Sequence, residues 1–247
     1  MIHLDPQELK NQSVEAESIF NVHRGDTIAP FLLLEPALAV LPIADGELDT
    51  AKLPFRTKTR WSAIDEIWET HKGTHSKLGL LEQLDYMGKL TRQLNPAPVR
   101  LLYPQSGRAT AAVCKDPEAV IDYKLYWIKC ASTAEAHYLA AIINSNHLYT
   151  SVEPLMPKGQ FGARDLMRHL WKLPIPAYDQ ENTLHHELAE AGKRAADQAA
   201  KVWQARKKER QEAGKATSSR AARDDIRKWL SESEIGAEIE TKVASLF

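Results

Sequence analysis

Apolar side chains recur at helical spacing in three parts of the first 150 residues. The first part covers residues 59–70, where Trp61, Ile64 and Trp68 share one face. The second begins at about Ser76, the expected N-cap, and continues to the NPAP sequence at residues 95–98. The third covers residues 132–149, with Ser132 or Thr133 as the cap. We therefore predict three helices in this half of the chain.

Other segments have the pattern of β-strands. Residues 14–43 are rich in strand-forming side chains, but Pro30, Pro36 and Pro42 interrupt the apolar run at residues 30–43. Because proline removes a donor from the strand ladder, we expect an edge or bent strand pair here, preceded by a turn at residues 24–26. Further strands are predicted at residues 100–103, 109–115 and 120–130, the last with alternating Tyr123, Leu125 and Trp127.

The C-terminal part of the sequence is mainly helical. We expect a short helix at residues 163–171, a proline-bounded strand at 172–179, and helices from residue 183 to 247 with a polar break at 214–219. The predicted fold class is α+β: a mixed or antiparallel sheet with packed helices and a C-terminal helical appendage. The expected domains are residues 1–182 and a helical extension at 183–247.

Composition narrows the class of protein. The 247 residues are 43% hydrophobic and 26% charged, which is typical of a globular chain and excludes collagen-like and wholly disordered proteins. No apolar run approaches the roughly 18–20 residues that span a bilayer. The N-terminus lacks a signal-peptide pattern, and two cysteines cannot form a disulfide framework or a four-ligand zinc site. We therefore expect a cytoplasmic, reduced setting and no membrane partner.

Charge is distributed unevenly along the chain. The formal net charge is −1, yet residues 1–54 contain nine acidic and three basic side chains. Residues 185–228 contain twelve basic and seven acidic ones. Such a basic C-terminal segment is compatible either with a polyanionic partner or with a solvated helix face.

Motifs for catalysis are missing. The sequence contains no GxGxxG, GxxxxGK[ST], HExxH or CxxC pattern. His71 and His75 are four residues apart but have no evident third metal ligand, and Cys114 is expected to be a small buried residue. We therefore assign no catalytic, cofactor-binding or metal-binding residue, and binding is the favoured class of function.

Five segments, in this order and spacing, carry a resemblance to a known family. They are VHRGDTIAPFLLLEP (22–36), LLEQLDYMGKLTRQL (80–94), YLAAIINS (138–145), Lys158-Gly159, and LPIPAYD (173–179) followed by His185 and Leu188. Together they resemble the C-terminal target-recognition region of adenine-N6 DNA methyltransferases, including the fused type II restriction–modification enzymes. The resemblance covers nearly the whole chain.

The resemblance implies that this chain recognises DNA and that a separate catalytic domain transfers the methyl group. The family's catalytic Pro-Pro-Tyr motif and glycine-rich loop are missing, and Asn95-Pro96-Ala97-Pro98 does not replace the motif. The implied partners are double-stranded DNA and a methyltransferase domain in cis or in trans. S-adenosylmethionine is expected in that domain and no cofactor in this chain.

Candidate DNA contacts follow from basic side chains near glycines and loops, although each group is also compatible with an ordinary solvated surface. The first surrounds a glycine-bracketed loop and consists of Lys158, Gln160, Arg164 and Arg168. The second flanks Trp61 and consists of Arg56, Lys58 and Arg60. The third consists of Arg92, Arg100 and Arg108.

Aromatic and basic segments leave further alternatives open. Tyr123, Tyr126 and Trp127 could stack on bases, but alternating strand aromatics are more often core, and Trp171 is expected to pack. The basic run near residues 201–210 could follow a DNA backbone, dock on a partner, or be solvated with Glu209 and Glu212 as ion-pair partners.

Three other functions compete with target recognition. The first is a specificity subunit of a type I restriction system. The second is a protein-interaction or regulatory module that does not touch DNA, and the third is an enzyme without recognisable motifs. Duplex binding that weakens steeply with salt favours DNA recognition over a protein-interaction module.

Overall fold

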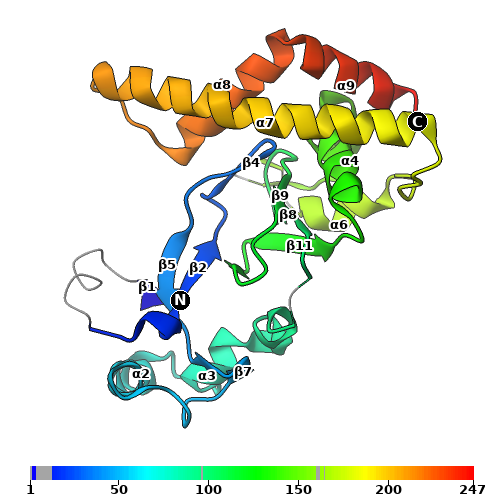
Figure 1. Ribbon diagram of the computed structural model, residues 1–247. Helices are drawn as coiled ribbons and strands as arrows, with labels where there is room; N and C mark the ends of the chain where they lie inside the picture. Colours follow the sequence, from blue (N-terminus) through cyan, green and yellow to red (C-terminus); the bar gives the residue numbers. More distant parts are fainter. Residues whose placement is uncertain (1, 4–12, 96, 160–161, 164) are drawn as a thin grey trace. The chain divides into compact units, whose positions relative to one another are not determined.

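The computed structural model describes residues 2–3, 13–95, 97–159, 162–163 and 165–247. Contacts between Cα atoms divide the chain into two compact units. The N-terminal unit comprises Met1–Val22, Pro36–Pro96 and Glu118–Ile121. The C-terminal unit comprises His23–Glu35, Ala97–Pro117 and Asp122–Phe247. The structure confirms the α+β class, with helices and small antiparallel sheets in the described residues (Figure 1).

The N-terminal unit contains a four-stranded sheet of order β1-β5-β2-β10. These strands are β1 (Ile2–His3), β5 (Ala37–Val40), β2 (Ile19–His23) and β10 (Val120–Ile121), and β2 follows the short helix η1 (Ala16–Ser18). The pair β2–β5 is antiparallel, with Ile19 opposite Val40. Hairpin β6 (Ile43–Ala44) and β7 (Glu47–Leu48) follows β5. The three prolines separate short strands, as their missing N–H donors require.

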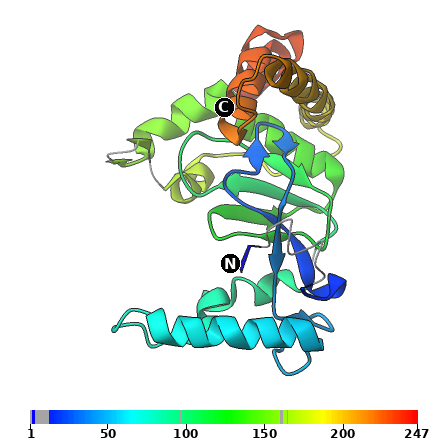
Figure 2. The same ribbon diagram turned by 90° about the vertical axis from the view of Figure 1, so that its left-hand side faces the viewer.

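The helical part of the N-terminal unit is only partly as predicted. Helix α2 (Phe55–His71) contains the predicted helix 59–70 and begins four residues earlier. The predicted helix at 76–94 is wrong: it is divided into α3 (Leu80–Leu84), η2 (Tyr86–Gly88) and η3 (Thr91–Gln93). Gly79, not Ser76, is the N-cap of α3, and its N–H donates to Glu82. Figure 2 shows α2 from the side.

The C-terminal unit contains a three-stranded antiparallel sheet of order β11-β8-β9. Its strands are β8 (Arg100–Pro104), β9 (Ala112–Cys114) and β11 (Leu125–Lys129), and a hairpin is formed by β3 (Ile28–Ala29) and β4 (Leu32–Leu33). The predicted single strand 120–130 is wrong because Asp122 forms a turn, accepting the Lys124 N–H at 2.9 Å. Tyr123 lies in that turn and is 60% exposed, so it is not core.

Helix α4 (Thr133–Asn144) is the centre of the C-terminal unit. Ser132, one of the two expected caps, caps it by accepting the N–H of Glu135. Every residue from Ala136 to Ile143 is buried. The predicted helix 132–149 is interrupted at Ser145, whose hydroxyl caps the next helix, α5 (Asn146–Val152). A hydroxyl that accepts a later N–H favours a helix start, which explains the break.

Residues 153–179 connect this helix to the C-terminal helices. The elements are η4 (Glu153–Leu155), β12 (Lys158–Gly159), β13 (Gly162–Ala163), α6 (Leu166–His169) and η5 (Leu170–Lys172). The predicted strand at 172–179 is wrong: this segment is extended but joins no sheet. Tyr138 donates to the carbonyl of Pro176 at 3.1 Å, and the N–H of Asp179 donates to His185 at 3.1 Å. Hydrogen bonds to the side chains of Tyr138 and His185, and not strand pairing, therefore hold this segment in place.

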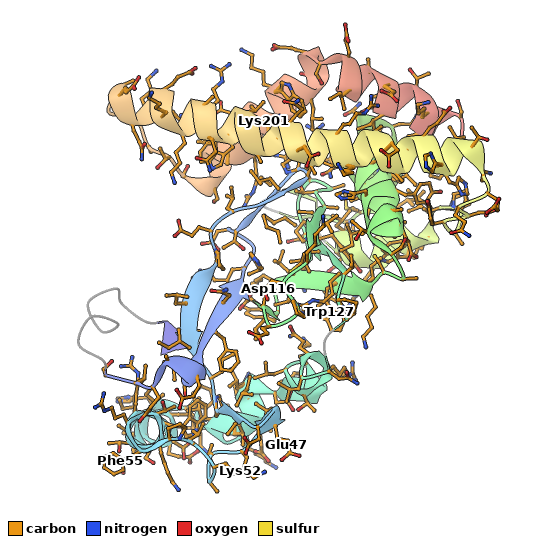
Figure 3. All side chains as sticks on the ribbon, viewed as in Figure 1. Glu47, Lys52, Phe55, Asp116, Trp127 and Lys201 are labelled. Atoms are coloured by element: carbon orange, nitrogen blue, oxygen red, sulfur yellow. The ribbon has the colours of Figure 1, made fainter. Side chains whose placement is uncertain are left out.

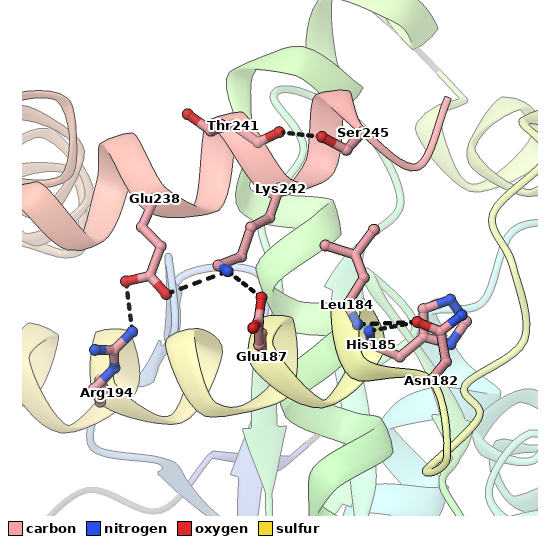
Figure 4. A network of polar contacts seen from close by, with 9 residues as sticks. All are labelled: Asn182, Leu184, His185, Glu187, Arg194, Glu238, Thr241, Lys242 and Ser245. Carbon is pink, nitrogen blue, oxygen red and sulfur yellow. Dashed lines mark hydrogen bonds and ion pairs between the residues drawn. The ribbon is translucent and has the colours of Figure 1, made fainter.

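The predicted C-terminal helices are confirmed as α7 (Thr183–Glu212), α8 (Ser219–Glu232) and α9 (Glu234–Ala244). Helix α7 packs across α4, and α8 and α9 both contact α7 (Figure 1). Ion pairs join the helices: Arg194 reaches Glu238 at 2.6 Å, and Lys242 pairs with Glu187 (Figure 4). The boundary expected between residues 182 and 183 stays a prediction, while the contacts group these helices with α4. Among the described residues, no helix is long and apolar enough to cross a membrane.

The contact between α4 and α7 is very close. A Cβ atom added at Gly192 would lie 2.2 Å from the backbone oxygen of His137 and 3.3 Å from Cβ of Ala141. Ala189, Ala195 and Ala199 are also buried on α7. Small side chains on one helix therefore allow the two backbones to approach.

We predict that Gly192→Ala lowers the free energy of unfolding by about 1–3 kcal/mol, because the added methyl group must push the helices apart. This is opposite to the roughly 1 kcal/mol by which alanine favours an isolated helix. Urea unfolding followed by circular dichroism measures it. Gly73→Ala is the matched control, because nothing lies within 4 Å of its added Cβ. Equal unfolding midpoints for the two variants would contradict the close contact.

His137 predicts a pH dependence for the same interface. His137 is 5% exposed, and burial, with a contribution from Lys115, lowers its pKa to about 4. Lys193 also lowers this pKa, and Asp197 and Glu190 raise it.

The unfolded chain binds a proton at this histidine near pH 6.5, while the folded chain does not until about pH 4. Above pH 6.5 the imidazole is neutral in both states and costs no stability. As the pH falls from 6.5 to 4, protonation of the unfolded chain lowers the free energy of unfolding by about 3 kcal/mol. The free energy of unfolding of wild type minus that of His137→Leu should therefore fall by about 3 kcal/mol over this range. A difference that is constant from pH 7.5 to pH 4 would contradict the burial of a neutral imidazole.

Candidate nucleic-acid interface

The first predicted group of DNA contacts is only partly described by the structure. Lys158 belongs to β12, which pairs with β13, and Arg168 is exposed on α6. Gln160 and Arg164 lie outside the described residues. The described residues of this segment form the paired strands β12 and β13 and the short helix α6, and the proposed roles of these residues stay predictions.

The second group lies at the start of α2. The carboxylate of Glu15 accepts the N–H groups of Arg56 and Thr57 at 2.9 and 2.8 Å. Desolvation opposes ionisation of this carboxyl, but the hydrogen bonds from Thr57 and Arg56 outweigh it and lower its pKa to about 2. Because Glu15 fills the helix N-terminus, this end of α2 is not open to a phosphate.

The side chains of this group have different environments. Arg56 and Lys58 are exposed, and Lys58 donates to the carbonyl of Ala51 at 3.1 Å. Arg60 is half-buried. Phe55, the first residue of α2, is 83% exposed (Figure 3).

The third group divides into one structural and two exposed arginines. Arg100 is 1% exposed and donates to the carbonyl of Asp116 at 2.7 Å. Its guanidinium also lies 5.9 Å from the ring centroid of Trp127, which Figure 3 labels together with Asp116. Arg100 therefore holds the sheet together and is not a surface contact. Arg92 and Arg108 are exposed.

Arg108 belongs to a cluster of arginines within the C-terminal unit. It lies between β8 and β9, donates to Oδ1 of Asn146 at 3.1 Å, and its guanidinium carbon is 5.0 Å from the ring centroid of Tyr149. Arg227 of α8 donates to Oγ1 of Thr110 at 2.8 Å, and this hydroxyl donates to the carbonyl of Arg108 at 3.1 Å. Thr110 therefore connects the two arginines.

Arg223 is the third member of this arginine cluster, which we define as Arg108, Arg223 and Arg227. It lies one helical turn before Arg227 and donates to the carbonyls of Ile28 and Gly25 at 2.9 and 2.6 Å. These bonds fix α8 against β3 and its preceding turn. Arg223 therefore has mainly a structural role, while Arg108 and Arg227 present positive charge beside it.

The electrostatics of the arginine cluster are unusual. Burial, reinforced by Arg108 and Arg223, lowers the pKa of Arg227 to about 10. Asp224 partly offsets this shift but also lies 3.9 Å from Arg220. A guanidinium has five N–H donors. Among the described residues, the guanidinium of Arg227 makes one hydrogen bond, to Thr110. An oxyanion that accepts from these donors would relieve the repulsion between the cations.

Arg223 and Arg227 were missed in the sequence. Their four-residue spacing places them on one helix face, but the many acidic neighbours favour a solvated helix. The cluster depends on the docking of α8 beside Thr110, because Arg227 and Thr110 are 117 positions apart in the sequence.

Three cations of the basic run at residues 201–210 pair with acidic side chains of the chain itself. Arg206 pairs with Glu209 at 2.8 Å, and Arg210 makes two hydrogen bonds to Asp225 of α8 at 2.8 and 3.1 Å. Lys208 lies 3.9 Å from Glu212. Of the three alternatives that the sequence leaves open for this run, these contacts match the one in which Glu209 and Glu212 are ion-pair partners. Arg210 also has a role in docking α8 onto α7.

Aromatic side chains of the C-terminal unit pack against one another. The indole N–H of Trp171 donates to the hydroxyl of Tyr103 at 3.0 Å, and the two ring centroids are 5.8 Å apart. Tyr103 in turn stacks on Tyr126. Trp171 is nevertheless 41% exposed, so it packs with one part of its ring and leaves another at the surface.

The remaining polar sites do not favour a metal ion or a nucleophile. Within the described part of the chain, no three His, Cys, Asp or Glu side chains group as metal ligands. Cys114 is buried, and burial raises the pKa of its thiol, which fits the predicted structural role. A surface depression of about 350 Å³ lies between α7 and α9, but its Glu187, Glu190 and Glu238 balance its cations.

Comparisons with known proteins give a fold relationship. No protein-family model and no curated protein matches the sequence. Among solved structures, the chain is similar to the type IIL restriction–modification enzyme MmeI in complex with DNA, with a TM-score of 0.54 and 13% identity. A second similar structure is the type IIG restriction endonuclease BpuSI, with a TM-score of 0.48, 14% identity, and coverage of 97% of this chain and 28% of that chain. The MmeI match covers 99% of this chain and 30% of the MmeI chain, so nearly all of this chain has the fold of a segment of a larger protein.

Proposed function

We propose that this chain binds double-stranded DNA as a non-catalytic part of a restriction–modification enzyme. The observation that carries the proposal is the arginine cluster, in which Arg227 is partly desolvated beside Arg108 and Arg223. Such a site prefers an anion with several oxygens, and the phosphate of a nucleic-acid backbone is one. The fold shared with a segment of MmeI, a restriction–modification enzyme solved with DNA, supports the same function.

The arrangement of the cluster suggests how a duplex is held. Arg108 is exposed and braced by Asn146 and the ring of Tyr149, so its guanidinium is oriented before DNA arrives. Arg227 supplies a second cation from a different segment. Two phosphate contacts from separate elements fix the register of a duplex, and side chains that reach base edges then read the sequence.

The finer part of the proposal is target recognition for an adenine-N6 methyltransferase. The sequence resemblance supports it, and it assigns S-adenosylmethionine and methyl transfer to a catalytic domain in cis or in trans. In this arrangement the present chain positions the duplex while the other domain acts on an extruded adenine.

Removing one phosphate contact should change the salt dependence of binding. We expect the affinity of the wild-type chain for duplex DNA to fall steeply between about 50 and 200 mM salt. Arg108→Ala should reduce the slope of log affinity against log salt by about 0.9, and affinity near 0.1 M salt by roughly eightfold. Fluorescence anisotropy with a labelled duplex measures both quantities.

Arg206→Ala is the matched control, because it removes the same charge from an exposed arginine that pairs with Glu209. It should leave the salt slope unchanged. Equal slopes for wild type and Arg108→Ala would contradict a phosphate contact at the arginine cluster. A wild-type chain that binds no duplex would contradict DNA recognition altogether and favour a protein-interaction module.

A further inference from the structure

An exposed apolar turn in the N-terminal unit has no role in the proposed phosphate contacts. Tyr86 is 50% exposed and Met87 is 67% exposed. Both lie in η2, between α3 and η3. Most of their apolar surface is therefore in water and is not stabilised by burial in the core of the unit.

The backbone of this turn is also strained. Met87 has φ of 61° and Gly88 has φ of 67°, so both occupy the left-handed region. Glycine adopts this conformation without difficulty, but the Cβ of methionine meets its own following carbonyl oxygen. The turn therefore keeps methionine at a position where glycine or asparagine would fit better. Strained positions of this kind are concentrated at functional sites.

A single aspartate holds the turn in place. The carboxylate of Asp85 accepts the N–H groups of Leu90 and Thr91, each at 2.8 Å, and the Thr91 hydroxyl at 2.5 Å. The N–H of Gly88 donates to the carbonyl of Asp85 at 2.7 Å. Leu90 is buried in the core of the unit. The tip is therefore fixed at both ends and presents its side chains in one orientation.

Two cations lie near the tip, one of which, Arg92, also interacts with the carboxylate of Asp85. Lys89 and Arg92 are exposed, and Nε of Arg92 lies 3.9 Å from the position of a Cβ on Gly88. The two nearby carboxylates in the sequence, Asp85 and Glu82, both accept backbone N–H groups. Cations beside a small apolar tip fit a polyanion with an apolar interior, which describes duplex DNA.

We propose that Met87, supported by Tyr86, is a wedge that inserts at a base step of duplex DNA while Lys89 and Arg92 contact the flanking phosphates. Methionine is one of the apolar side chains that unstack base pairs in this way. The inference rests on the proposed function, because it needs a chain that binds DNA, but it uses residues of the other unit. It also assigns the predicted DNA contact Arg92 to a phosphate beside the base step at which Met87 inserts.

Met87→Gly tests the wedge without endangering the fold. Glycine relieves the left-handed strain, so the variant should unfold at the same or a higher urea concentration than wild type. The DNA probe is a duplex of alternating TA steps with 2-aminopurine in place of some adenines, since these steps unstack most easily. Wild type should raise the 2-aminopurine fluorescence on binding, and Met87→Gly should lose most of this increase.

Two matched variants complete the experiment. Met87→Leu keeps an apolar side chain and should retain the fluorescence increase. Asp45→Gly relieves the same kind of strain at another left-handed residue, with φ of 53°. This variant should give the same fluorescence increase as wild type. The salt slope of Met87→Gly should equal that of wild type, because no phosphate contact is removed.

The outcomes separate the wedge from DNA binding itself. If wild type binds the duplex with a steep salt slope but Met87→Gly gives the same fluorescence increase, the wedge is overturned and the proposed function stands. If Met87→Gly instead changes only self-association, measured by size-exclusion chromatography, the turn is a protein contact and the wedge is also overturned. Absence of any duplex binding by wild type overturns both proposals.

Discussion

The close packing of α4 and α7 is the contact on which the C-terminal unit depends. Gly192 allows the α7 backbone to approach the carbonyl of His137, and the neighbouring alanines of α7 are buried as well. Because α8 and α9 pack on α7, their positions follow from this contact. Ion pairs such as Arg210–Asp225 then fix α8 on α7, although close apolar packing supplies most of the free energy.

Docking of α8 has a consequence for charge. It places Arg223 against the carbonyls of Gly25 and Ile28, and Arg227 against Thr110, next to Arg108. Each arginine alone is an ordinary side chain on an amphipathic helix or a turn. Burial of Arg227, reinforced by its two arginine neighbours, lowers its pKa, and the three side chains form a group that favours a phosphate. The candidate interface is thus a product of tertiary packing.

The sequence predicted the elements that depend on local patterns. These include helix α4, for which Ser132 was one of two expected caps, and the start of α7. For the basic run the sequence left pairing with Glu209 and Glu212 as one of three alternatives. Three predictions failed where a side chain competes with regular structure. Asp85 interrupts the helix at 76–94, Asp122 interrupts the strand at 120–130, and Ser145 divides the helix at 132–149. The arginine cluster was not predictable because its members meet only through α8 docking.

Chemical labelling of arginines tests the central claim most directly. The chain is treated with phenylglyoxal with and without duplex DNA, and modified residues are identified by mass spectrometry. The account predicts that DNA protects Arg108 and Arg227 from modification, while Arg206 reacts equally in both conditions. Equal modification of Arg108 with and without bound DNA would contradict the assignment of the arginine cluster as a phosphate-binding site.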